Sequence, residues 1–135
     1  MIRVEAFVEV EPNNYEEMKR YLESFNENYR SEFEKKANSF VFRRFMKKSQ
    51  ELLLKLKEEL FLLRYTTDYD GKTARVLLFF NDNVFINLKI EKPLEYKFLE
   101  PILKMTIFNN DYIRKRISKD FENFGKVLSI EVKKE

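Results

Sequence analysis

Residues 60–90 read LFLLRYTTDYDGKTARVLLFFNDNVFINLKI. Turn-forming residues, Asp70-Gly71 and residues 81–83, divide this stretch into three apolar runs. Apolar runs bounded by such residues are typical of consecutive antiparallel strands. The stretch therefore predicts a three-strand meander over residues 60–67, 73–80 and 84–90.

The two turns also predict the register of this meander. Asp70-Gly71 suits a two-residue type I′ turn, because both of its central positions need positive φ, and it pairs Tyr65 with Val76. A three-residue loop at 81–83 continues the pairing into the third strand. Because side chains alternate between the two faces of a strand, both hairpins place the same apolar set on one face. These residues are Phe61, Leu63, Tyr65, Val76, Leu78, Phe80, Val84, Ile86, Leu88 and Ile90.

The opposite face of the meander is a candidate interaction surface. Phe79 and Phe85 are expected to be cross-strand neighbours there, next to Leu62 and near Leu77. Aromatic side chains among cations on a sheet can stack unpaired bases. Exposed apolar patches more commonly mark protein contacts. The alternative to base stacking is therefore that a helix or a second subunit covers this face.

The chain before the meander begins as a strand and continues as a helix. Residues 2–10 alternate between apolar and polar side chains, which predicts a half-buried strand. Apolar residues from Tyr15 to Phe33 then recur at spacings of three and four, which predicts one amphipathic helix to about Ala37.

Residues 39–58 allow two interpretations. Their apolar spacing and their richness in Leu, Lys and Glu favour helix, whereas the alternation of Leu52, Leu54 and Leu56 would also fit a strand of the sheet.

After the meander, proline and glycine positions mark the expected elements. Pro93 and Pro101 each suit a first helical turn, so two short helices are expected over 93–99 and 101–108. A further helix starts at Asp111, and Gly125 would close it in the C′ position. Residues 126–133 are expected to form a last strand, with Leu128, Ile130 and Val132 facing inward.

This order of elements predicts one α+β domain over residues 1–135. Helices would pack on one face of a mostly antiparallel sheet of about five strands, giving two layers. The five strands are the N- and C-terminal strands and the central meander.

Composition narrows the classes of function. The chain has 135 residues, neither Cys nor His, and a net charge of only +3. It therefore lacks the commonest general base and zinc ligand and any thiol chemistry. We predict no metal site, no cofactor and no enzymatic activity. The longest apolar run, residues 76–80, is far too short to span a bilayer, and no signal peptide is recognised. The sequence thus predicts a cytoplasmic protein with no membrane partner.

Two basic clusters are candidate anion-binding sites. The first lies between Glu34 and Glu51, where acidic residues are absent, and a helix would juxtapose its like charges. Arginine and lysine in such a run can contact a phosphate backbone; the alternative is an ordinary solvated helix face. The second cluster lies on the helix after residue 110 and has the same alternative. The candidate residues are Arg43, Arg44, Lys47 and Lys48 in the first cluster, and Arg114, Lys115 and Lys119 in the second.

Two resemblances to known folds are visible. The segment FENFGKVLSIEV, residues 121–132, resembles the passage from first helix to second strand in RNA-recognition motifs. It covers under a tenth of the chain, and the aromatic strand motifs of that family do not follow it. The order strand, helix, strand, strand, helix, strand resembles ferredoxin-like folds, but a fold does not give a function. No family is assigned.

The sequence favours a small non-catalytic binding module. Its basic helix face would contact nucleic acid or another polyanion through phosphates. The alternative is a protein-interaction or homo-oligomeric module, including a homodimer, that uses the aromatic outer face of the sheet.

Overall fold

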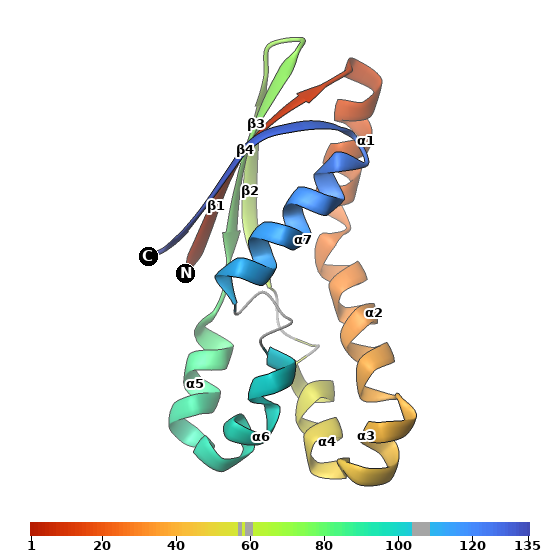
Figure 1. Ribbon diagram of the computed structural model, residues 1–135, viewed down its shortest axis with the longest axis vertical. Coiled ribbons are helices and arrows are strands. Elements are labelled where there is room, and N and C mark those ends of the chain that lie inside the picture. The colour runs from red at the N-terminus through yellow and green to blue at the C-terminus, as the bar shows by residue number, and fades with distance from the viewer. Residues whose placement is uncertain (57, 59–60, 104–108) are drawn as a thin grey trace.

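The computed structural model describes residues 1–56, 58, 61–103 and 109–135 (Figure 1). Its four strands form one antiparallel sheet in the order β2-β3-β1-β4. They are β1 (Ile2–Val10), β2 (Leu62–Tyr69), β3 (Thr73–Phe80) and β4 (Gly125–Lys134). The α+β class is confirmed, but the described sheet has four strands rather than about five.

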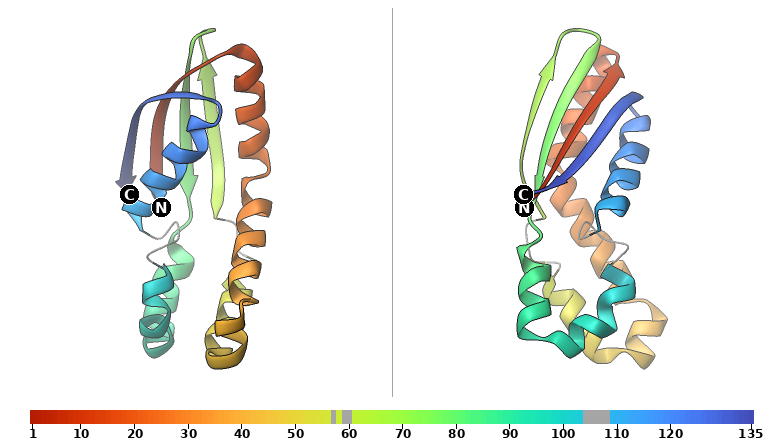
Figure 2. Two further views of the ribbon diagram at one scale, coloured as in Figure 1. Left: turned by 45° about the vertical axis from the view of Figure 1, so that its right-hand side comes forward. Right: turned by 60° about the vertical axis from the view of Figure 1, so that its left-hand side comes forward.

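The described helices that pack on this sheet all lie on one of its faces (Figure 2). Between β1 and β2 the chain forms α1 (Pro12–Glu23), α2 (Phe25–Ala37), α3 (Phe40–Phe45) and α4 (Lys47–Leu56). Between β3 and β4 it forms α5 (Asn83–Glu91), α6 (Pro93–Leu103) and α7 (Asn110–Glu122). With α1 and α7 as the crossover helices, the strand order is that of the split βαβ, or ferredoxin-like, arrangement. We call α3 to α6 the helical end, because they lie together beyond one end of the sheet (Figure 1).

The prediction of a third meander strand over residues 84–90 is wrong, because residues 83–91 form α5. The carbonyl of Asp82 accepts hydrogen bonds from the backbone N–H groups of Phe85 (3.1 Å) and Ile86 (3.2 Å), which starts the helix. Phe85 and Leu88 are buried at helical spacing, whereas Ile86 is exposed. Residues 84–90 were expected to pair with one edge of β3. That edge is occupied by β1, which pairs with the whole length of β3.

The hairpin of β2 and β3 is confirmed, with its register shifted by two residues. Tyr65 pairs with Leu78 rather than with Val76, because the two central residues of the turn are Gly71, whose φ is 93°, and Lys72 rather than Asp70 and Gly71. The Asp70 carboxylate accepts hydrogen bonds from the N–H groups of Lys72 (2.8 Å) and Thr73 (2.7 Å), which fixes this turn. A shift of two residues leaves the faces unchanged.

Bulges change which residues of the edge strands face the core. An irregularity between Leu62 and Arg64 turns Leu63 outward, although the alternation placed it inside. A second irregularity, beside Phe7 in the pairing of β1 with β4, leaves Leu128 exposed, contrary to the prediction. Both corrections follow from one extra residue in a ladder, which reverses the alternation beyond it.

The predicted helical stripes are largely confirmed. Residues from Tyr15 to Phe33 at the predicted spacing are buried, although the helix is interrupted at Ser24. Within residues 39–58, α3 and α4 cover 40–45 and 47–56, so the helical interpretation is confirmed and no described residue of this range belongs to the sheet.

The helix that begins at Pro93 differs from the prediction. It continues through Pro101, so the predicted break there is wrong. Burial of Leu99 and Leu103 on one side of α6 supports the helix despite the hydrogen bond that a proline cannot donate. The remainder of the second predicted short helix, 104–108, lies outside the described residues.

Candidate functional site

The helix α3, whose sequence is FVFRRF, leaves most of its side chains exposed at the helical end. Only Phe42 is buried, since a helix of one and a half turns can direct little more than one side chain toward its neighbours. Phe40, Val41 and Phe45 are 64%, 54% and 72% exposed. The rings of Phe40 and Phe45 meet edge to face with their centroids 6.1 Å apart.

Four residues predicted to contact phosphates lie in the same helix or at the start of the next one. We call Arg43 and Arg44 of α3 with Lys47 and Lys48 of α4 the cationic tip. All four are exposed. Within residues 1–56, 58, 61–103 and 109–135, no ion pair involves any of them. By contrast, Arg75 lies 2.7 Å from a carboxylate of Glu5. The cationic tip therefore carries uncompensated positive charge.

The break between α3 and α4 places two of these cations at the start of a helix. The chain leaves helical conformation at Met46, so Arg43 and Lys47 are not the i,i+4 pair of one helix that the sequence predicted. Instead, Lys47 and Lys48 are the first residues of α4, where the helix dipole disfavours cations. Their position costs helix stability and leaves their charge available to an external anion.

The second predicted cluster lies elsewhere. Arg114, Lys115 and Lys119 are exposed on α7, which lies over the sheet, whereas α3 lies at the far end of the molecule (Figures 1 and 2). The two basic clusters do not converge on one surface.

Arg116, between those cations, is part of a structural network. Its guanidinium donates to Glu32 (2.8 Å), Asp120 (3.0 Å) and the hydroxyl of Tyr112 (3.2 Å). Asp120 also accepts a hydrogen bond from Tyr21 of α1. Burial and this hydrogen bond raise the pKa of Tyr21 far above its usual value. The network joins α7 to α1 and α2.

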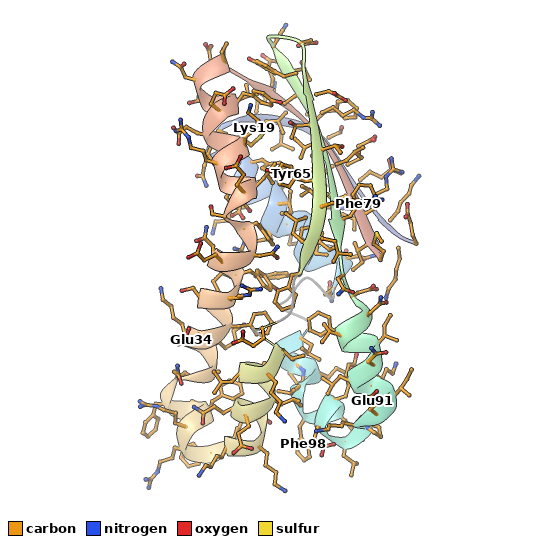
Figure 3. The ribbon with its side chains drawn as sticks, turned by 180° about the vertical axis from the view of Figure 1, so that it is seen from behind. Lys19, Glu34, Tyr65, Phe79, Glu91 and Phe98 are labelled. Carbon is orange, nitrogen blue, oxygen red and sulfur yellow. The ribbon has the colours of Figure 1, made fainter. Side chains whose placement is uncertain are left out.

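The predicted interaction surface on the outer face of the sheet does not form as expected. Leu62 is buried, and Phe85 is buried in α5 rather than placed beside Phe79. Phe79, labelled in Figure 3, remains half-buried, and the guanidinium of Arg64 lies 4.3 Å from its ring centroid. Leu77 is half-buried as well. Of the four predicted residues, two are left on this face.

Exposed apolar side chains concentrate instead at the helical end. Seven of the ten large apolar residues that are exposed in the described part of the chain lie there. They are Phe40, Val41 and Phe45 of α3, Ile86 and Ile90 of α5, and Leu94 and Phe98 of α6. The sequence did not predict this surface, because the apolar residues of 39–58 were assigned to the buried side of one longer helix.

A cleft of about 350 Å³ separates α4 from α5. Leu52 and Leu56 of α4 face Val84 and Leu88 of α5 across it, and Asn87 also lines it.

The described residues hold no group of three or more carboxylates suited to a metal ion.

No helix in the described ranges combines the length and hydrophobicity needed to cross a bilayer. No protein-family model, curated protein or solved structure was found to match this chain.

Proposed function

We propose that the protein is a small non-catalytic module that binds a polyanion, such as a nucleic acid, through the cationic tip. The observation that carries this proposal is the set of four exposed cations at one end of the molecule, none of which forms an ion pair with a carboxylate in the part of the chain that the structure describes. Uncompensated like charges destabilise the folded protein. An external anion that neutralises them would turn this cost into binding energy.

The proposed contacts are to phosphates rather than to bases. Exposed lysine and arginine side chains can reach backbone phosphates, but such contacts carry no sequence information. Each phosphate contact on a single strand contributes a slope of about −0.7 to log K against log salt concentration. Four contacts therefore predict a slope of roughly −3.

Charge reversal tests this proposal. The variant Arg43→Glu/Arg44→Glu/Lys47→Glu/Lys48→Glu is titrated against a short fluorescein-labelled single-stranded DNA at about 50 to 200 mM salt. We expect its affinity to fall by more than about tenfold, because the electrostatic term supplies essentially all of a non-specific affinity. Arg114→Glu/Lys115→Glu/Lys119→Glu is the matched control and should lose less. Equal losses in both variants, or an affinity insensitive to salt, would contradict the proposal.

A second candidate function is contact with a protein or a second copy through the outer face of the sheet. It is favoured by the absence of any described helix over that face (Figure 2) and by half-buried Phe7, Leu77 and Phe79 on it. A mass that rises with protein concentration in light scattering would support it.

A further inference from the structure

Resting on the proposed function, we infer that the polyanion is the surface of a bilayer that contains anionic lipids. The cationic tip contacts the lipid phosphates, and Phe40, Val41 and Phe45 enter the apolar boundary beneath the headgroups. This inference goes beyond polyanion binding because it names the partner and gives a role to the exposed apolar side chains.

The first argument is the mixture of side chains on one short helix. Arg43 and Arg44 lie between Val41 and Phe45 in sequence, and all four are exposed. A bilayer interface accepts both kinds of side chain, since phosphates lie directly above hydrocarbon. A nucleic acid offers phosphates and base faces, but a strand held by its phosphates leaves an aliphatic side chain such as Val41 less apolar surface to enter than a bilayer does.

The second argument is position. The tip lies at the extreme end of the molecule, away from the sheet (Figure 1), and Phe98 of α6 is exposed at the same end (Figure 3). A protruding end can touch a flat bilayer without the sheet colliding with it. A nucleic acid strand is usually held along a groove, whereas the cleft between α4 and α5, described above, is lined by none of the four cations.

The third argument is charge complementarity. Residues 83–103 of the helical end carry three lysines and three glutamates, which balance. The positive charge of this end therefore comes from the cationic tip. Each Lys or Arg near an anionic membrane strengthens binding by about fivefold, so four would contribute several hundred-fold.

The sequence predicted no membrane partner because it has no run long enough to span a bilayer. A peripheral contact needs no such run, since an amphipathic surface can lie in the interface. The inferred contact is therefore consistent with the lack of a spanning helix among the described residues.

A single tryptophan can report this contact, because the chain has none. Phe45→Trp is mixed with vesicles of phosphatidylcholine alone or with added phosphatidylglycerol. We expect its emission to shift to shorter wavelength only with the anionic vesicles. Leu128→Trp, exposed on β4, is the matched control and should not shift. Adding the four charge reversals should weaken vesicle binding by about a hundredfold or more.

A second variant distinguishes a failure of the lipid inference from a failure of the proposed function. Phe40→Ser/Val41→Ser/Phe45→Ser changes only exposed side chains, so it should fold, bind single-stranded DNA as before and lose most vesicle binding. DNA binding by the parent protein without any vesicle binding or emission shift would overturn the lipid inference and leave the polyanion proposal standing. Failure to bind either probe would overturn both. Self-association through these residues, detected by light scattering without vesicles, would also overturn the inference.

Discussion

Replacing Phe61 by alanine is expected to lower the free energy of unfolding by about 3–5 kcal/mol. Phe61 is completely buried. Its ring contacts Tyr29 with centroids 4.7 Å apart, stacks on Phe33 at 5.2 Å, and lies 6.1 Å from Phe85. These partners come from α2 and α5, so Phe61 packs the start of β2 against both helices.

The backbone around Phe61 leaves little freedom for the cavity to collapse. Its N–H donates to the side chain of Asn26 (3.0 Å), and its carbonyl accepts from the N–H of Asn81 (2.8 Å). The free-energy cost of a buried cavity rises with the volume that remains after the structure relaxes. We therefore expect the loss for Phe61→Ala to lie in the upper half of the range of about 3–5 kcal/mol.

Urea denaturation followed by circular dichroism measures this loss. Leu63→Ala, two residues away and exposed, is the control and should change stability by no more than about 0.5 kcal/mol. A cost below about 1 kcal/mol for Phe61→Ala would mean that the aromatic cluster is not packed as described.

Gly125→Ala should also destabilise the protein strongly, by about 2–4 kcal/mol. A β-carbon at this position would lie 2.2 Å from the carbonyl oxygen of Glu9 and 3.1 Å from the α-carbon of Val10. Both atoms are backbone, so relief requires β1 and β4 to separate where Val10 pairs with Gly125. The neighbouring variant Lys126→Ala, which shortens an exposed side chain, is the control in thermal denaturation. Equal stability of the two variants would contradict this close approach.

Gly125 also illustrates what the sequence could and could not reveal. Its position after a helix predicted a left-handed C′ residue, but among the described glycines only Gly71 has a positive φ. The need for glycine at 125 comes from a strand 116 residues earlier in the chain, because Glu9 approaches it. Local patterns do not contain such a contact.

The strand predicted over residues 84–90 was wrong for a different reason. Five of its seven residues are apolar, so Val84, Ile86 and Leu88 fit an alternating strand while Phe85 and Leu88 fit a helix. The pairing of β1 with β3 decides in favour of the helix, because it occupies the edge of β3 that a strand over residues 84–90 would need. By contrast, β1 and the stripe from Tyr15 to Phe33 were predicted correctly, because only one period fits each of them.

The candidate site was likewise predictable in part. The sequence identified the cations of the tip, because charge is a local property and long cationic side chains rarely lie buried. It did not identify the exposed Phe40 and Phe45, since which side of a short helix meets the core depends on tertiary packing. The sequence also did not predict the separation of the tip from α7, which follows from the path of α2 beyond the sheet (Figure 1).

The central claim, that the cationic tip is the surface that meets a polyanion, is tested most directly by amide chemical-shift mapping. The labelled protein is titrated with a short single-stranded DNA at low salt. We predict that the largest shifts fall on residues 40–48, with little change on α7 or on the outer face of the sheet. Shifts centred on Arg114, Lys115 and Lys119, or on β3 around Phe79, would contradict the claim.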